Sequence, residues 1–233
     1  MMHRTWVLAV VGASLLGVGG CGGPGGEGRL PWSSIWRTPS PTATTIYDDP
    51  PVRSNQPRNG TNHLNAPVVA TGESSWANVS GRRAWRYIVI HHSASERGNA
   101  AVFNAEHKSR GWDGLGYHFV IDNGHGGPDG AVEVGYRWRG QRTGAHTGKT
   151  PGNAYNEQGI GICMVGDFTG RMPSRAQLAS LDRLVRYLCA TYSIPASRVI
   201  GHRDAPNTAT QCPGNTFHRY LHSTYRPHLT RGR

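Results

Sequence analysis

Three residues of types that bind borderline-soft metals lie at or after the ends of short apolar runs, two of them directly and one in a following loop. His91 ends the run 86–91, His202 follows Val199 and Ile200, and Cys212 lies ten residues further on. Two imidazoles and one thiolate suit zinc, and three protein ligands leave a fourth tetrahedral position for water, as in hydrolytic zinc sites. Zinc lowers the pKa of bound water to about 7 and polarises carbonyl groups. The three residues therefore indicate metal-assisted hydrolysis.

Spacing alone does not make this trio specific, because the chain contains 12 histidines and most histidines in proteins are not ligands. The surrounding short motifs and their order are more informative. They are His91-His92-Ser93, Gly116-Tyr117-His118-Phe119, Gly144-Ala145-His146-Thr147, residues 156–162, Val165-Gly166-Asp167-Phe168, and Gly201-His202-Arg203-Asp204 followed by Cys212-Pro213-Gly214.

Together these motifs resemble the N-acetylmuramoyl-L-alanine amidase family, which includes amidase-type phage lysozymes and animal peptidoglycan recognition proteins. The resemblance covers roughly residues 87–221. It implies a peptidoglycan recognition protein-like fold, in which a central mixed β-sheet is flanked by helices and Zn2+ lies in a groove. It also implies the activity, which is hydrolysis of the amide bond between N-acetylmuramic acid and L-alanine in peptidoglycan or muropeptides.

The resemblance further implies which histidines bind the metal. Residues 87–90 are apolar on both faces of a strand, so alternation cannot choose between His91 and His92. The family pattern makes His91 the ligand, with His202 and Cys212. His92 is then a supporting residue, and His118 is expected to be a packed strand histidine rather than a fourth ligand that would exclude water.

Two further residues match catalytic positions of the family. Tyr117 matches a tyrosine that hydrogen-bonds near the zinc-bound water. Thr210 occupies a position beside the scissile carbonyl, where a hydroxyl can donate to the developing oxyanion. Plainer roles also fit these residues: Tyr117 as a core aromatic at the start of a strand, and Thr210 as a hydroxyl that caps its own loop.

Substrate contacts are expected around this centre. His146 and Asn156 match family positions that line the substrate groove. Residue chemistry adds aromatic faces for sugar or lactyl groups and guanidinium groups for stem-peptide carboxylates, in Trp112, Trp138, Arg137 and Arg142.

Cys163 distinguishes two branches of the family. The branch that handles soluble anhydro-muropeptides carries a glutamate at this position, so a cysteine favours the tyrosine-using branch that acts outside the cytoplasm. Cys163 and Cys189 fall on a predicted strand and a predicted helix. Export would permit a disulfide between them, and two buried free thiols fit the pattern equally well.

The elements that must position these residues are predicted from periodicity. Apolar and β-branched runs predict strands at 86–91, 116–121, 131–134, 160–165 and 199–200. Helices are predicted at 99–110 and at 173–192, where Ser174 can act as the N-cap. Strands and helices that alternate irregularly indicate the mixed α/β class.

The N-terminus has the pattern of a targeting segment. Residues 1–21 contain a short basic region, an apolar stretch of roughly 12 residues and a lipobox-like end at Cys21, which predicts lipidation. An ordinary secretory signal is the alternative, and both predict export. Residues 22–84 are predicted to be a flexible Gly/Pro/Ser-rich tether, residues 85–228 the zinc amidase domain, and residues 229–233 a tail. We therefore expect a membrane-anchored lipoprotein that faces the periplasm or cell wall, or otherwise a secreted protein.

The formal net charge of +11 favours an anionic partner. The basic residues are scattered, with neither an aromatic-interleaved RNA-binding pattern nor a helix-turn-helix, so no nucleic acid partner is expected. A non-catalytic peptidoglycan receptor on the same scaffold is the main alternative function. Such relatives typically lose the cysteine ligand, and Cys212 is present here. The sequence does not indicate an oligomeric state.

Overall fold

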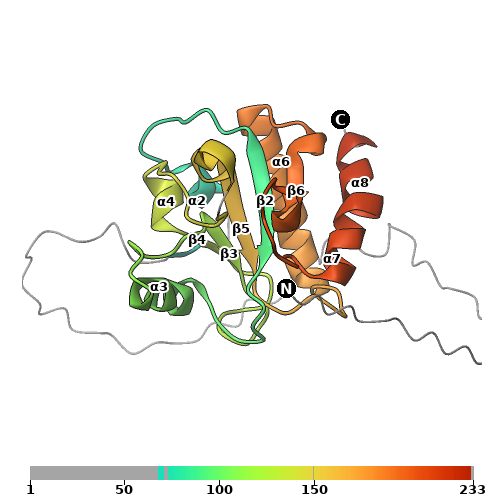
Figure 1. Cartoon of the computed structure of the whole chain (residues 1–233), viewed down its shortest axis with the longest axis horizontal. Coiled ribbons are helices and arrows are strands. Elements are labelled where there is room, and N and C mark those ends of the chain that lie inside the picture. Colours follow the sequence, from blue (N-terminus) through green and yellow to red (C-terminus); the bar gives the residue numbers. More distant parts are fainter. Residues whose placement is uncertain (1–67, 71–72, 149, 232–233) are drawn as a thin grey trace, which may run out of the picture.

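The computed structural model describes residues 68–70, 73–148 and 150–231, and it builds them around one six-stranded sheet (Figure 1). The strands are β1 (Val68–Ala70), β2 (Tyr87–His92), β3 (Phe119–Ile121), β4 (Val132–Val134), β5 (Gly159–Met164) and β6 (Val199–Gly201). Each of the five predicted strands corresponds to one of β2 to β6, with ends that differ by at most three residues, and β1 is an additional strand.

The sheet is mixed, which confirms the predicted fold class. Its order is β1-β4-β3-β5-β2-β6. Strands β3, β5, β2 and β6 run parallel, whereas β4 is antiparallel to β3 and β1 is antiparallel to β4. The register aligns His91 with Cys163 across β2 and β5, and Ile90 with Gly201 across β2 and β6. The carboxyl ends of β2 and β6 therefore meet at one edge of the sheet.

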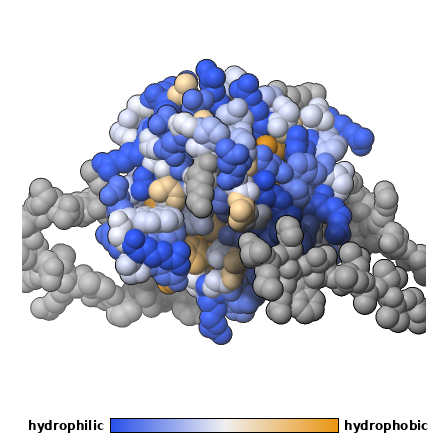
Figure 2. All heavy atoms as spheres, in the orientation of Figure 1, coloured by the Kyte–Doolittle hydropathy of each residue, from blue (hydrophilic) through white to orange (hydrophobic). Residues whose placement is uncertain are grey.

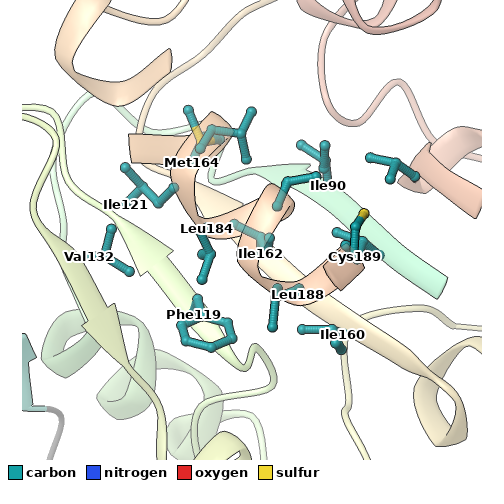
Figure 3. Packing of buried hydrophobic residues seen from close by; sticks show 14 of the residues in the cluster. Ile90, Phe119, Ile121, Val132, Ile160, Ile162, Met164, Leu184, Leu188 and Cys189 are labelled. Carbon is teal, nitrogen blue, oxygen red and sulfur yellow. The ribbon is translucent and has the colours of Figure 1, made fainter. Parts of the chain in front are cut away.

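One face of the sheet carries the main apolar core. Alternate residues of β2 and β5 point to this face, where they pack against leucines of helix α6 (Arg175–Tyr192) (Figure 3). Ser174 caps α6 as predicted, since its hydroxyl accepts from the Gln177 backbone N–H while the Gln177 side chain accepts from the Ser174 N–H.

The C-terminal segment covers the same face and was not predicted as helical. It forms α7 (Asn215–Tyr220), a π-helical turn (Leu221–Tyr225) and α8 (Arg226–Arg231). Its buried residues recur every four positions, at Phe217, Leu221, Tyr225 and Leu229. That spacing is the helical signal in the sequence.

The opposite face carries a smaller apolar cluster under helix α3 (Ala100–Ser109). Asn99 caps α3, because its side-chain oxygen accepts from the Val102 N–H. Short helices complete the chain: α2 (Ser74–Ala77), α4 (Tyr136–Arg139) and α5 (Ala154–Glu157), with single 3-10 turns at Pro151–Asn153, Ala196–Arg198 and His202–Asp204.

The boundaries of the folded domain differ from the prediction. Trp76 of α2 is buried in the main core, and β1 pairs with β4, so the domain begins before residue 85. Leu229 of α8 is buried as well, so the predicted tail belongs at least in part to the domain. The predicted signal, Cys21 and most of the predicted tether lie outside the described residues.

Polar residues dominate the surface seen in Figure 2. Within the described part of the chain, the large apolar side chains that are exposed are Val102 and Trp112. No helix among the described residues is long and apolar enough to cross a membrane.

Candidate metal centre

The three predicted metal ligands converge at the carboxyl edge of the sheet. His91 lies near the end of β2, and His202 begins the turn that follows β6. These strands are parallel neighbours in register, so the two imidazole rings lie side by side, with centroids 4.6 Å apart. Cys212 places its Sγ 3.7 Å from His91 Nδ1. One potential ligand atom from each of the three residues lies within 4.8 Å of the others.

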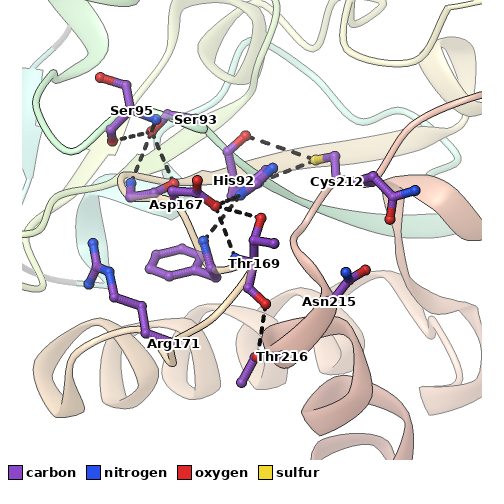
Figure 4. A network of polar contacts seen from close by, with 12 residues as sticks. His92, Ser93, Ser95, Asp167, Thr169, Arg171, Cys212, Asn215 and Thr216 are labelled. Carbon is purple, nitrogen blue, oxygen red and sulfur yellow. Dashed lines mark hydrogen bonds and ion pairs between the residues drawn. The ribbon is translucent and has the colours of Figure 1, made fainter.

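The Cys212 sulfur accepts a backbone hydrogen bond and lies near a positive charge. The His92 backbone N–H donates to Sγ at 3.3 Å (Figure 4). Burial raises the pKa of the Cys212 thiol to about 12, while the His92 N–H and the Arg203 guanidinium oppose that rise. A divalent cation next to the sulfur would favour the thiolate far more strongly.

Both imidazoles of the centre are held neutral. Burial lowers the pKa of His91 well below its ordinary value, and the neighbouring His146 and His202 lower it further. Burial also lowers the pKa of His202 to about 4, with His92 contributing. Neutral imidazoles offer the bare nitrogen that a metal requires. The donor set of two neutral imidazoles and one buried thiol fits zinc.

His146 fixes the orientation of His91 from behind. The Gly159 carbonyl can only accept, so the 3.2 Å contact with His146 Nε2 requires a proton on that nitrogen. His146 Nδ1 therefore accepts from His91 Nε2–H at 3.1 Å. This leaves His91 Nδ1 with its lone pair toward Cys212, so two linked hydrogen bonds select the ligand atom.

His146 and Asn156 thus differ from their predicted role in the groove. Asn156 accepts from the backbone N–H groups of His146 and Thr147, and it donates to Thr147 and Asn153. Both side chains are buried. This is a correction: they support the metal centre from within the protein rather than lining an open surface.

Tyr117 lies beside the cluster. Its ring centroid is 5.2 Å from that of His91 and 5.6 Å from that of His107. Its hydroxyl faces the Cys163 thiol, and burial raises its pKa well above the ordinary value. Tyr117 therefore remains a protonated donor at neutral pH. The Tyr117 side chain is partly buried and packs against the smaller apolar cluster under α3. Tyr117 can therefore pack against the core and donate from its hydroxyl at the same time.

The Thr210 hydroxyl oxygen accepts from the Cys212 backbone N–H at 3.1 Å. This is the loop-capping contact that the sequence allowed. It uses the oxygen as an acceptor and leaves the hydroxyl proton for another group. Capping therefore does not prevent Thr210 from donating to a substrate.

The other two histidines of the motifs have the expected structural positions. His92 Nδ1 accepts from the Phe168 N–H at 3.4 Å, and Asp167 lies 3.7 Å away (Figure 4). His118 is fully buried, where Nδ1 accepts from the Gly161 N–H and Nε2–H donates to the Arg142 carbonyl. Because both nitrogens of His118 are engaged, it is not a fourth ligand.

Two of the predicted substrate contacts are buried, and those predictions are wrong. Trp138 is fully buried in the main core and donates to the Trp76 carbonyl, so it offers no face to a sugar. Arg137 is buried and donates to the carbonyls of Leu115 and Thr143 at 2.7 and 2.6 Å. Its side chain therefore links the segment that contains Leu115 to the segment that contains Thr143.

Trp112 differs from Trp138, since it is 43% exposed. Its ring lies 4.6 Å from that of His107, which in turn neighbours Tyr117. An exposed indole two rings away from His91 remains a predicted sugar contact. Arg142 contributes its carbonyl to His118 and places its guanidinium over the Tyr136 ring at 5.8 Å.

The two cysteines outside the centre that the structure describes, Cys163 and Cys189, are not joined in a disulfide. Cys163 lies next to His91 on the face of the sheet that carries the metal centre, which we call the site face. Cys189 lies in the main core on the opposite face, which α6 covers and which we call the α6 face. The sheet separates them, so of the two possibilities left by the sequence the structure shows buried thiols.

One group of ligand-type residues was missed by sequence reasoning. Asp204, His218 and His222 also bring potential ligand atoms within 4.8 Å of one another. The four-residue spacing of His218 and His222 was the available signal, but it has meaning only on a helix, and no helix was predicted there.

Comparison with known proteins places these features in context. The profile of the N-acetylmuramoyl-L-alanine amidase family matches residues 81–215. Peptidoglycan recognition protein 1 of Bos indicus is 31% identical over 160 residues, which cover 64% of this chain and 76% of that protein. The N-acetylmuramoyl-L-alanine amidase of Mus musculus is 32% identical over 123 residues, which cover 52% of this chain and only 20% of the mouse protein.

Solved structures agree with this result. Bumblebee PGRP-SA is 28% identical, with a TM-score of 0.50 and coverage of 66% of this chain and 93% of that chain. Wild-type PGRP-LB of Drosophila is 26% identical, with a TM-score of 0.50 and coverage of 66% and 92%. The fold is therefore that of the peptidoglycan recognition proteins.

Proposed function

The chain belongs to the N-acetylmuramoyl-L-alanine amidase family, and from that premise we propose that it is a zinc-dependent amidase of peptidoglycan. The reaction is hydrolysis of the amide bond between N-acetylmuramic acid and L-alanine. The observation that carries this proposal is the convergence of His91, His202 and Cys212. When bound, zinc would supply Lewis acidity and lower the pKa of water.

The residues around the centre have separate tasks in this proposal. His146 and the Gly159 carbonyl hold His91 in the tautomer whose Nδ1 is bare. Tyr117 keeps its hydroxyl proton at neutral pH and can donate to the carbonyl oxygen as negative charge develops there. Thr210 offers a second hydroxyl proton from the loop that carries Cys212.

The family also contains peptidoglycan recognition proteins, so binding without hydrolysis is the competing function. The retained thiol of Cys212, with the His92 N–H directed at it, supports an enzyme. A purely binding site does not require a buried thiol among two neutral imidazoles.

A digestion assay tests the proposal. The full chain would be incubated with purified peptidoglycan and with defined muropeptides, with and without a chelator. We expect a new free L-alanine amino group, a matching mass for the released stem peptide, and loss of both after chelation with recovery on addition of zinc. Binding without these products would establish the receptor function instead.

We also propose that the protein acts outside the cytoplasm, anchored through Cys21. The support is the sequence pattern of residues 1–21. Expression of the wild-type chain and of Cys21→Ser, followed by membrane fractionation and mass analysis, tests this. An unmodified Cys21 in the exported wild-type protein would argue for simple secretion.

A further inference from the structure

A second group of ligand-type side chains lies on the C-terminal flank of the domain. Asp204 ends the turn His202–Asp204, His218 belongs to α7, and His222 belongs to the π-helical turn that follows. His218 Nε2 lies 2.7 Å from Asp204 Oδ1, and His222 Nε2 lies 2.8 Å from Asp204 Oδ2. Two imidazole nitrogens from one helical segment therefore converge on a single carboxylate from another segment.

The geometry of this group is set by local structure. The two histidines are four residues apart on a helical segment, so their rings share one face, with centroids 4.4 Å apart. The Gly201 backbone N–H donates to Asp204 Oδ2 at 2.8 Å and holds the carboxylate in place. The side chains of Asp204, His218 and His222 are 20%, 22% and 38% exposed, so solvent ions and water can reach them.

We propose that Asp204, His218 and His222 form a second metal site, specific for divalent transition ions such as Zn2+, Co2+ or Ni2+. Two imidazoles and one carboxylate suit these ions, and water can fill the remaining coordination positions. The site is chemically distinct from the first because it contains no sulfur. It does not depend on the amidase function, since none of its side chains belongs to the proposed catalytic machinery.

Binding would exchange two hydrogen bonds for coordination bonds. Both imidazoles now donate Nε2–H to Asp204, so each must carry its proton on Nδ1 once Nε2 binds the ion. Arg226 opposes that exchange at His222, because its Nη1 donates to His222 Nδ1 at 3.0 Å. Arg226 also adds a positive charge next to the site. The second site is therefore weaker than the first, and Arg226 sets its affinity.

Cobalt titration of the metal-free full chain tests the proposal, because a thiolate gives Co2+ a strong charge-transfer absorption that nitrogen and oxygen ligands do not give. We expect two bound equivalents in the wild type, with this absorption saturating at the first. The double variant H218Q/H222Q should lose the second equivalent and keep the first. Cys212→Ser should lose the charge-transfer absorption and keep the sulfur-free equivalent.

Arg226→Gln supplies an independent check that keeps all three ligands. It should tighten the second equivalent about tenfold, because it removes a nearby positive charge and frees His222 Nδ1. One equivalent in the wild type, with no second equivalent gained by Arg226→Gln, would overturn the proposal. So would a second equivalent that survives in a folded H218Q/H222Q protein, as judged by circular dichroism. The first equivalent reports separately on the amidase centre.

Discussion

The two faces of the same pair of strands have opposite chemistry. On the α6 face, Ile90 and Ile162 pack against leucines of the long helix (Figure 3). On the other face, one residue along each strand, His91 and Cys163 lie next to Tyr117 and the metal centre. Each of the two strands, β2 and β5, therefore has one face in the apolar core and the other face at the metal centre.

This contrast indicates how the domain can hold a polar, buried cluster. The α6 face supplies apolar burial, which is the main stabilising term in folding. The site face has small residues where the large core residues would be, and the ring of His146 packs directly on Gly161. A Cβ at residue 161 would lie 2.4 Å from that ring. Changes on the two faces should accordingly separate activity from stability.

Cys212→Ser should have the largest effect and act on activity alone. A serine hydroxyl is a much poorer zinc ligand than a thiolate, so we expect zinc to be lost from the His91, His202 and Cys212 centre and specific activity to fall by at least about 100-fold. The free energy of unfolding of the metal-free protein should change by less than about 1 kcal/mol. Metal analysis, muropeptide digestion and urea unfolding measure the three quantities. Full zinc content in the variant would contradict the ligand assignment.

Leu184→Ala should have the converse effect. Leu184 belongs to α6 and is fully buried against the sheet, so we expect a loss of about 2–5 kcal/mol in the free energy of unfolding. Activity per folded molecule should stay unchanged. Val102→Ala, at a 43% exposed position, is the control for a loss of apolar atoms without burial. A fall in intrinsic activity at Leu184 would show that the faces are not separable.

Tyr117→Phe keeps the ring and removes the hydroxyl. Because the proposed role is proton donation, we expect kcat to fall about 100-fold while zinc content stays the same. Steady-state kinetics and metal analysis distinguish this from the packing role. If kcat is unchanged, Tyr117 is a core aromatic only.

His146→Leu removes the acceptor that orients His91. Zinc affinity should fall about 10–100-fold, as expected for a partner of a ligating histidine. His146→Gln should recover part of the loss, because its amide oxygen can accept from His91 Nε2–H. Competition with a chromophoric chelator measures both. Equal losses in the two variants would mean that packing, not tautomer selection, is responsible.

Asp122→Asn tests a buried carboxyl group that follows β3, on the side of the sheet that carries the metal centre. Burial raises the pKa of Asp122 to about 8, and the neighbouring Glu133 carboxylate adds to the rise. Below about pH 4 both the folded and unfolded states hold the proton. Between about pH 4 and 8 the unfolded chain releases it first, so wild-type stability declines as pH rises, by up to about 1.4 kcal/mol per pH unit.

The neutral amide that Asp122→Asn introduces cannot titrate. The free energy of unfolding of this variant should therefore rise relative to wild type from pH 5 to pH 8. Parallel slopes in urea unfolding experiments across that range would refute the assignment. Asp167→Asn, at an exposed carboxylate, is the control.

The sequence by itself determined the elements and the type of chemistry. Apolar runs indicated β2 and β5, because a strand buried on both faces needs apolar residues throughout. Ser174 and the leucine stripe indicated α6, because caps and helical periodicity are local properties. The types of His91, His202 and Cys212 indicated zinc, because ligand softness belongs to the residue and not to the fold. The helices after residue 215 also have a local signal in the sequence, since their apolar residues recur every four positions.

The tertiary structure alone decided which side chains meet. Strand alternation after the apolar residues 87–90 does not distinguish His91 from His92, and the sequence chose His91 only through the family resemblance. The packing of α6 on one face gives the physical reason, because it directs His91 to the metal centre and His92 to the Phe168 loop. His146 contacts His91 and orients it, and Trp138 lies in the main core, although both were predicted to contact substrate. His146 donates to the carbonyl of Gly159 and Trp138 to the carbonyl of Trp76, and these partners lie 13 and 62 residues away along the chain. Contacts of this kind depend on strand order and register, which a residue's own type and local spacing do not contain.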